Sequence, residues 1–275
     1  MPVKKDSSGR RYVEVETEVP GTPEEVWQAI ATGPGITSWF VPTKIEEREG
    51  GAITLDFGPG MEATSVVKVW DPPRRFVAES EGNMGPGSPS VADEWTIEAK
   101  AGGTCRVRVV HSWFASTDDW DNQFEDVEKG WPAFFRILKI YLTHFRGQPS
   151  ELIQLLAMSP ENKSASWKKV VESLGLTRLA EGQRVETAQG APPLAGIVER
   201  VVDEDLFVRL EKPTSGVAHF FAMSMGDQAY LSISLYLYGA QAKSVAAREA
   251  PVWQAWINGL FPPADATTES EASKP

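Results

Sequence analysis

Residues 104–147, TCRVRVVHSWFASTDDWDNQFEDVEKGWPAFFRILKIYLTHFRG, change their apolar period part of the way along. Over residues 104–114 apolar and polar side chains alternate, which is typical of a strand with one buried face. From Asp119 apolar residues recur every three or four positions, which predicts one long helix. The apolar stripe of that helix consists of Phe124, Val127, Trp131, Phe134, Phe135, Leu138, Tyr141, Leu142 and Phe145. We expect Pro132 to kink the helix or to mark a restart, because proline removes one helical hydrogen bond.

Upstream of this stretch, the pattern indicates one strand followed by a helix. In the stretch from Tyr12 to Val19, residues Val13, Val15 and Thr17 alternate with Tyr12, Glu14, Glu16 and Glu18, which is the period-two pattern of a strand with one solvent-exposed face. Thr22 and Pro23 precede two acidic residues, which is the chemistry of a capped helix start. Gly33-Pro34-Gly35 is expected to end this helix, and Ile36–Phe40 to add one short helical turn.

Short alternating runs separated by glycine and proline turns lie between these elements and the long helix. They are Thr43–Glu46, Ala52–Phe57, Met61–Trp70, Arg75–Glu79, Val91–Ala99 and Thr104–Phe114. Such short connections predict an antiparallel meander.

The rest of the chain repeats this order in a shorter form. Glu151–Met158 is predicted to be a first strand, and a helical tail of the preceding unit is the alternative. Ser159-Pro160 opens a helix that Gly175 stops. Strand-like runs follow at Gly182–Thr187, Gly196–Val202, Leu206–Leu210, Ala218–Met223 and Ala229–Tyr238. A last helix has an apolar face formed by Val245, Val252, Trp253, Trp256, Ile257 and Leu260.

The order strand, helix, meander, helix therefore occurs twice. We predict an α+β protein of two tandem helix-grip domains, each a curved antiparallel sheet wrapped around a long C-terminal helix. The first domain is predicted to span residues 11–147 and the second 150–262. Residues 1–10 and 263–275 are predicted to be flexible tails.

The composition excludes several classes of protein. Lys and Arg number 27 against 38 acidic residues, a net charge of −11, so nucleic acid is not an expected partner. The polar N-terminus does not resemble a signal peptide, and no stretch approaches the ~18 apolar residues of a membrane span. We therefore predict a cytoplasmic protein. The single cysteine, Cys105, is expected to be a small buried residue.

Four motifs of the first half carry a family resemblance. They are Thr22-Pro23-Glu24-Glu25-Val26-Trp27, the turn Ile36–Phe40 ending in Trp39-Phe40, the hairpin Val69–Phe76, and Val110–Phe114 followed by a long helix containing Gly130-Trp131. In this order and spacing, over about Arg11–Gly147, they resemble the homologues of the activator of heat shock protein 90 ATPase, a family of the START-like (SRPBCC) superfamily. The second domain is similar to this superfamily only in its order of elements, and is interpreted as a divergent START-like copy.

The resemblance implies a cavity between the concave sheet face and the long helix, which such folds use to hold hydrophobic or aromatic small molecules. The predicted ligand-binding residues are Trp39, Phe40, Phe57, Trp95, His111, Trp113, Phe135 and Leu138. Two alternatives stay open: the aromatic residues fill the core, and His111 is structural rather than a ligand anchor or proton donor. Trp113 departs from the small residue usual in the family, so its indole is expected to fill part of the cavity.

Binding of a hydrophobic small molecule by the first domain is therefore the predicted function, with the second domain as a structural partner. One alternative is an enzyme of the polyketide cyclase or dehydratase kind, in which His111 and a nearby carboxylate such as Glu94 perform acid–base chemistry. Another is the family's name-giving role, an interaction that regulates a chaperone ATPase. Binding is favoured over catalysis because the sequence lacks a complete catalytic constellation.

No metal or other cofactor is predicted. The acidic cluster Asp118–Asp121 lies where the long helix is expected to begin, a position at which negative charge is favourable in any case. Gly58-Pro59-Gly60 and Gly82–Gly87 contain prolines and join strands to strands, so they are interpreted as hairpin turns rather than phosphate-binding loops.

Overall fold

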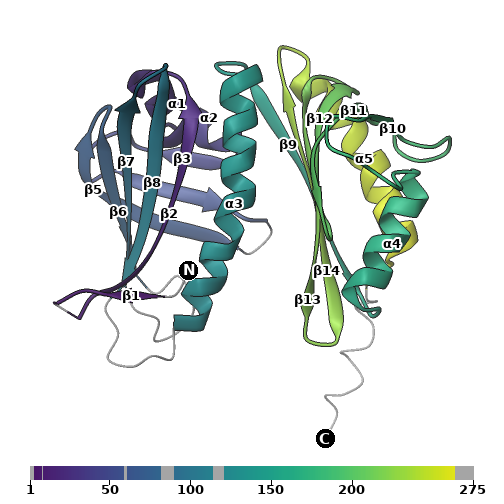
Figure 1. Cartoon of the computed structure of the whole chain (residues 1–275), viewed down its shortest axis with the longest axis horizontal. Coiled ribbons are helices and arrows are strands. Elements are labelled where there is room, and N and C mark those ends of the chain that lie inside the picture. Colours follow the sequence, from purple (N-terminus) through teal and green to yellow (C-terminus); the bar gives the residue numbers. More distant parts are fainter. Residues whose placement is uncertain (1–2, 8, 59–60, 82–89, 114–120, 264–275) are drawn as a thin grey trace, which may run out of the picture. The chain divides into compact units, whose positions relative to one another are not determined.

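The computed structural model describes residues 3–7, 9–58, 61–81, 90–113 and 121–263, without the side chains of residues 121–129. The chain divides into two compact units, which we call unit 1, ending at Ser150, and unit 2, beginning at Glu151. Each unit combines one antiparallel sheet with α-helices (Figure 1). The predicted α+β class with two tandem helix-grip domains is confirmed.

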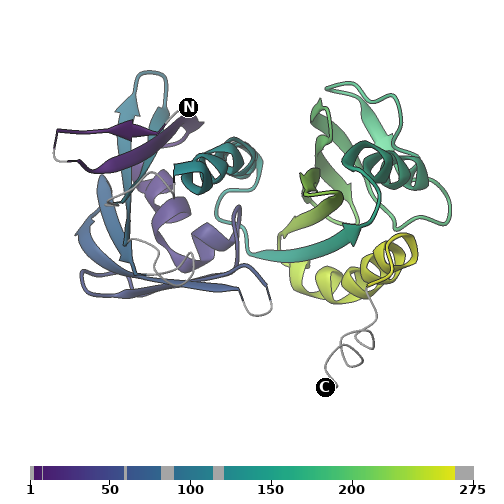
Figure 2. The ribbon, with the colours of Figure 1, turned by 90° about the horizontal axis from the view of Figure 1, so that it is seen from below.

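The sheet of unit 1 has eight strands in the order β1-β2-β8-β7-β6-β5-β4-β3. The strands are β1 Lys4–Lys5, β2 Arg11–Pro20, β3 Thr43–Ile45, β4 Ala52–Asp56, β5 Glu62–Asp71, β6 Arg75–Ser80, β7 Val91–Lys100 and β8 Thr104–Trp113. The helices are α1 Pro23–Ala31, α2 Gly33–Thr37 and α3 Asp121–His144. In Figure 2 the strands curve around these helices.

The curvature of this sheet brings its first long strand against its last. β2 pairs with β8 along its whole length, from Arg11 opposite Trp113 to Pro20 opposite Thr104. Alternate residues of both strands, Val13 and Val107 among them, are buried on the face that α3 covers. The period-two pattern therefore determines which face of the sheet receives the long helix.

The junction between α1 and α2 differs from its prediction. Thr22 caps α1 as expected, since its Oγ1 accepts from the Glu25 amide at 3.3 Å and the Glu25 carboxylate accepts from the Thr22 amide at 2.9 Å. However, Gly33-Pro34-Gly35 is the first part of α2, which Thr32 caps, and not a linker before it. A Cβ on Gly35 would lie 1.9 Å from the Gln28 carbonyl oxygen, so glycine allows α2 to start directly against α1.

The two ends of unit 1 also refine the prediction. Lys4 and Lys5 form β1 against β2, in a stretch that the sequence predicted to be a flexible tail. The turn between the two strands is closed by Asp6, whose carboxylate accepts from the Arg10 amide at 3.1 Å. At the other end, α3 is continuous through Pro132. Its predicted start at Asp119 and the final strand residue Phe114 lie outside the described residues.

The sheet of unit 2 has six strands in the order β10-β11-β12-β13-β14-β9. They are β9 Ser150–Ser159, β10 Arg184–Glu186, β11 Ala195–Val202, β12 Asp205–Lys212, β13 Gly216–Met225 and β14 Gln228–Tyr238, with helices α4 Lys163–Leu174 and α5 Ala242–Leu260. The helical alternative for Glu151–Met158 is wrong, because this stretch is strand β9. First and last strands are again neighbours, so unit 2 repeats the topology of unit 1.

Both helices of unit 2 lie on the same side of its sheet (Figures 1 and 2). Buried side chains of the sheet and of both helices form one core. Leu206, Phe220 and Leu235 contribute from the strands, and Val170 and Trp253 from the helices. Most members of this core are aliphatic. The core belongs to unit 2 alone, as expected of an independent domain. None of the described helices of either unit is long and apolar enough to cross a membrane.

Candidate functional site

Unit 1 contains a cavity of about 290 Å³ between the concave face of its sheet and its helices. Its lining comes from α1 and α2 with the following turn, from strands β4 to β8, and from α3. The described lining residues are Ile30, Ile36, Trp39, Phe40, Ile53, Leu55, Phe57, Ala63, Thr64, Ser65, Phe76, Ala78, Ser80, Val91, Asp93, Trp95, His111 and Trp131. A mostly apolar wall with a few polar groups is typical of sites for small organic molecules.

Aromatic rings form a connected part of this wall. The Trp95 ring meets the Trp131 ring edge to face at 5.2 Å between centroids, and Phe40 stacks on Trp131 at 5.5 Å. Trp39 lies 6.1 Å from Trp95, and its indole N–H donates to the Ala29 carbonyl at 2.9 Å. Each such ring pair adds about 0.5–1.5 kcal/mol beyond the burial of its area. The rings are therefore held in fixed orientations around the cavity.

A polar group of three residues also lies in the wall. His111 Nδ1 is 2.5 Å from Asp93 Oδ1, and the Trp131 indole N–H donates to His111 Nε2 at 2.6 Å. The His111 and Trp131 rings also stack, with centroids 5.3 Å apart. The His111 side chain is only 9% exposed, whereas the Asp93 side chain is 33% exposed. Asp93 is therefore the more accessible end of this group.

The sheet register explains how these three residues meet. Asp93 on β7 and His111 on β8 are directly opposite each other in the antiparallel ladder, so their side chains leave the same face of the sheet. Trp95, two residues beyond Asp93, shares that face. Trp131 reaches His111 from α3, the helix that covers the face. A contact between adjacent strands is thus completed by a residue from a third element.

Trp39, Phe40, Phe57, Trp95 and His111, five of the predicted site residues, line the cavity. The other three predicted residues, described next, do not appear in its lining.

Trp113 is completely buried in a small separate cluster with Val13 and Val91, so its indole does not fill the cavity as expected. Phe135 lies behind the wall, 5.4 Å from the Trp131 ring. Leu138 is fully buried. Of these three residues, Phe135 contacts rings that line the cavity, those of Trp95 and Trp131.

The carboxylate partner proposed for His111 needs correction. Glu94 accepts a hydrogen bond from Arg75 Nε at 2.7 Å and does not line the cavity, because neighbouring residues of a strand point to opposite faces. Asp93 is the carboxylate that meets His111. Sequence reasoning missed Asp93, although its spacing of two from Trp95 was a usable signal. Trp131 was recognised as part of the helical stripe, but its contact with His111 depends on packing.

Other reactive groups give no second site in the described part of the chain. No cluster of three or more His, Cys, Asp or Glu residues suited to a metal ion occurs there. Residues 118–120 of the acidic cluster lie outside it. Cys105 is fully buried and its thiol donates to the Gly21 carbonyl at 3.3 Å. Burial raises the pKa of this thiol, so little thiolate forms near neutral pH.

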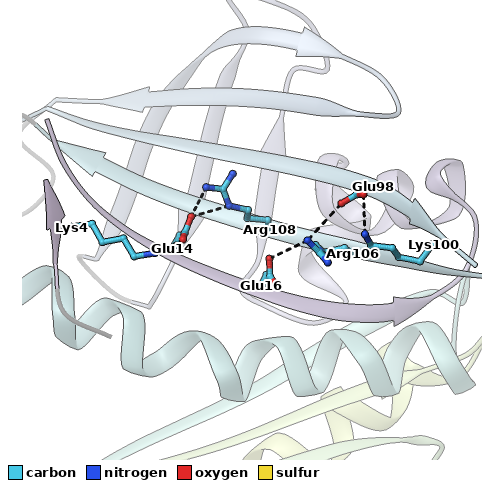
Figure 3. A network of polar contacts seen from close by, with 7 residues as sticks. All are labelled: Lys4, Glu14, Glu16, Glu98, Lys100, Arg106 and Arg108. Atoms are coloured by element: carbon cyan, nitrogen blue, oxygen red, sulfur yellow. Dashed lines mark hydrogen bonds and ion pairs between the residues drawn. The ribbon is translucent and has the colours of Figure 1, made fainter. Parts of the chain in front are cut away.

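The opposite face of the unit 1 sheet carries an outer ion-pair network, shown in Figure 3. Its members are Lys4, Glu14, Glu16, Glu98, Lys100, Arg106 and Arg108. Glu14 pairs with both Lys4 and Arg108. The hydrogen bond from Lys4, followed by that from Arg108, holds the pKa of Glu14 below its ordinary value. This face is charged and largely self-neutralised, which contrasts with the apolar wall on the inner face.

Unit 2 also contains a histidine–aspartate pair from adjacent strands. His219 Nε2 on β13 lies 2.8 Å from Asp205 Oδ1 on β12. The His219 ring stacks on Phe207, with centroids 4.2 Å apart. The neighbours of His219 in sequence, Ala218 and Phe220, belong to the core of unit 2. His219 therefore lies on the sheet face opposite that core, whereas His111 faces into its unit.

Fold and site together define a tandem helix-grip protein with an aromatic-lined cavity in its first unit. Residues 20–143 match the family model described as "Activator of Hsp90 ATPase homolog 1-like protein". The match lies within unit 1 and covers the stretch whose motifs resemble this family. No sequence among curated proteins matches the chain.

Several solved structures resemble the chain at low identity. CalU16 from Micromonospora echinospora is 20% identical, with 52% of this chain and 83% of that chain covered and a TM-score of 0.41. DynU16, titled a putative protein in the dynemicin biosynthetic locus, is 19% identical, with 90% and 97% covered and a TM-score of 0.42. The di-domain ARO/CYC BexL from the BE-7585A biosynthetic pathway is 16% identical, with 91% and 93% covered and a TM-score of 0.44.

Proposed function

We propose that unit 1 binds a hydrophobic or aromatic small molecule in the cavity between its sheet and helices. The observation that carries this proposal is the 290 Å³ cavity with its wall of aromatic and aliphatic side chains. That volume lies close to the lower end of the ~300–1,000 Å³ range of ligand pockets. A small ligand of two or three fused rings is therefore the best match to its size.

The packing around the cavity supports the proposal that it holds a ligand. Protein interiors normally fill their volume with side chains, so a cavity of this size between the sheet and the helices departs from ordinary core packing. Trp39 and Trp95, which border the cavity, are at most 8% exposed. Rigid rings held around a gap provide flat apolar surfaces for another ring to stack on.

The test uses naphthalene, 2-methoxynaphthalene and 2-naphthol as probes of the full chain. Binding is followed by isothermal titration calorimetry and by tryptophan fluorescence, since Trp39, Trp95 and Trp131 border the cavity. We expect 1:1 binding of at least one probe. Ala63→Phe places a ring in the cavity from β5 and should weaken binding at least ~10-fold, by steric exclusion.

Ala92→Phe is the matched control. Ala92 lies between Val91 and Asp93, both of which line the cavity, so its own side chain points to the outer face. This variant should bind the probes as the wild type does. Absence of binding by the wild type, or equal binding by Ala63→Phe in a correctly folded protein, contradicts the proposal. Near-ultraviolet circular dichroism checks the fold of both variants.

The Asp93–His111 pair in the cavity favours one second candidate, acid–base catalysis of the polyketide cyclase or dehydratase kind. This candidate predicts that the protein accelerates exchange of the α-protons of 2-tetralone in D2O by about 10²-fold or more. His111→Phe should abolish the acceleration. An exchange rate equal to that of buffer, measured by NMR, would eliminate the catalytic candidate and leave the binding proposal untouched.

A further inference from the structure

The hydrogen bonds of His111 determine which of its nitrogens carries the proton. An indole N–H can only donate, so the 2.6 Å bond from Trp131 requires a lone pair on His111 Nε2. The proton of the neutral ring therefore lies on Nδ1, which donates to Asp93 Oδ1 at 2.5 Å. Both ring nitrogens are used within the protein, and neither is available to a ligand in this arrangement.

Asp93 is the member of this group that can still accept a hydrogen bond from a ligand. An ionised carboxylate accepts several hydrogen bonds across its two oxygens, and His111 engages only Oδ1. The Asp93 side chain is 33% exposed and lines the cavity. A ligand in the cavity therefore meets a hydrogen-bond acceptor that carries negative charge and is held in place from behind by His111 and Trp131.

The charge balance of the wall strengthens this reading. Among the described lining residues, Asp93 is the only acidic one, and none is Lys or Arg. A carboxylate ligand would therefore face a like charge, with no Lys or Arg among the described lining residues to compensate it, in surroundings of low polarity where repulsion is strong. A neutral hydroxyl, in contrast, gains a charge-assisted hydrogen bond to Asp93.

We propose that Asp93 selects the ligand: the cavity takes neutral aromatic molecules that carry a hydrogen-bond donor, such as a phenolic hydroxyl, and excludes aromatic carboxylates. This inference rests on the proposed binding function. His111 and Trp131 act as positioning residues that fix the orientation of the Asp93 carboxylate.

The first test concerns the proton on His111 and needs no ligand. Two-bond ¹H–¹⁵N correlation NMR of the ¹⁵N-labelled protein at neutral pH distinguishes the tautomers of a neutral imidazole. We expect a protonated Nδ1 and an unprotonated Nε2 for His111. A protonated Nε2, in either the other tautomer or the charged ring, would overturn the assignment of roles.

The second test compares three ligands of one size at pH 7. 2-Naphthol is a neutral donor, 2-methoxynaphthalene lacks the donor, and 2-naphthoate is an anion, since phenols and carboxylic acids ionise near pH ~10 and ~4. We expect 2-naphthol to bind at least ~10-fold more tightly than either of the others, because a hydrogen bond to a charged group has that effect on an equilibrium constant. Calorimetric titration gives the three affinities.

Asp93→Asn tests the carboxylate directly. Its amide oxygen can still accept from His111 Nδ1, and its NH₂ group then turns toward the cavity as a donor. We expect the affinity for 2-naphthol to fall about 10-fold and 2-naphthoate to come within about 3-fold of 2-naphthol. Glu94→Gln is the matched control, because Glu94 pairs with Arg75 outside the cavity. It should leave the wild-type preference unchanged.

The outcomes separate this inference from the proposed function. If all three ligands bind equally to the wild type, the selection by Asp93 is wrong and the binding function stands. If 2-naphthoate binds most tightly, the inference is reversed. If no ligand of the series binds, both the proposed function and the inference fail. Because the wild-type series is informative by itself, the test holds even if Asp93→Asn does not fold.

Discussion

The space beneath the sheet of unit 2 is filled by Leu206, Leu235 and other aliphatic side chains, whereas in unit 1 the corresponding space is lined by Trp39, Trp95 and Trp131 around a cavity. In both sheets the strand before the first helix, β2 or β9, pairs with the last strand, β8 or β14, and the other strands of the meander follow in order, although unit 1 has eight strands and unit 2 six. Branched aliphatic chains interdigitate closely, while large flat rings constrain one another's orientation. The topology therefore provides a space between sheet and helices, and the shapes of the side chains around it determine whether it is filled or left as a cavity.

The two histidine–aspartate pairs extend the comparison. His111 lies on the cavity side of its sheet and has a third partner, Trp131. His219 lies on the face opposite its core and stacks on Phe207. The same residue types on adjacent strands thus face inward in one unit and outward in the other. The face of the sheet on which a histidine–aspartate pair lies, rather than the presence of the pair, determines whether the pair contributes to a site.

The largest expected effect comes from shortening one leucine in each unit. Leu235→Ala removes a completely buried side chain from the unit 2 core and should cost about 3–5 kcal/mol. Leu55→Ala alters a half-buried residue beside the cavity and should cost about 1 kcal/mol, because fewer contacts are lost. Hydrogen exchange by mass spectrometry measures the stability of each unit separately. Equal losses in the two units would contradict the expectation that Leu55, beside the cavity, makes fewer contacts than Leu235 in the filled core.

A medium effect is expected from replacing the two histidines. His111→Leu leaves the buried Trp131 N–H without its acceptor and Asp93 without its donor, and should destabilise unit 1 by about 2–3 kcal/mol. His219→Leu removes one hydrogen bond of unit 2 and should cost about 1 kcal/mol. Urea denaturation with the same unit-resolved hydrogen-exchange readout compares them. A larger loss for His219→Leu would show that the three-residue group of unit 1 is not the stronger of the two.

The smallest effect concerns the outer ion-pair network. Glu14→Gln should cost less than about 1 kcal/mol at pH 7, because its ion pairs are partly exposed. Since pairing lowers the pKa of folded Glu14, its contribution is complete above the ordinary value of 4.5 and is lost as pH falls through the lowered pKa.

The stability difference between wild type and Glu14→Gln should therefore shrink in acid and with added salt. Glu199→Gln in unit 2, where Glu199 pairs with Arg209 at 2.6 Å, is the matched comparison with one cation instead of two. It should cost less than Glu14→Gln. A difference for Glu14→Gln that stays constant from pH 7 to pH 3 would contradict the role assigned to its ion pairs.

Much of the fold was predictable from local patterns. The strand periodicity of Tyr12–Val19, the capping residue Thr22 and the helical stripe ending at Phe145 all express burial or hydrogen bonding within a few residues. The start of α2 was not predicted, because the composition of Gly33-Pro34-Gly35 resembles that of a linker. In the structure Gly35 permits α2 to begin close against α1. The pairing of β1 was also missed, because its residues are polar. Polar residues can form an edge strand when a residue of the neighbouring strand, such as Glu14, forms an ion pair with them.

The sequence by itself determined two sheets and their helices, since alternation and helical period record which side chains are buried. The aromatic lining of a cavity in the first unit was implied by the family resemblance. Only the tertiary structure decided that Asp93 rather than Glu94 faces His111, and that Trp131 completes the group. It also decided that Trp113 packs on Val13 and Val91 without lining the cavity, whereas Trp95 lines it. The physical reason is that a local pattern encodes burial, whereas partners and empty space depend on register between strands and on how rigid side chains from distant elements pack.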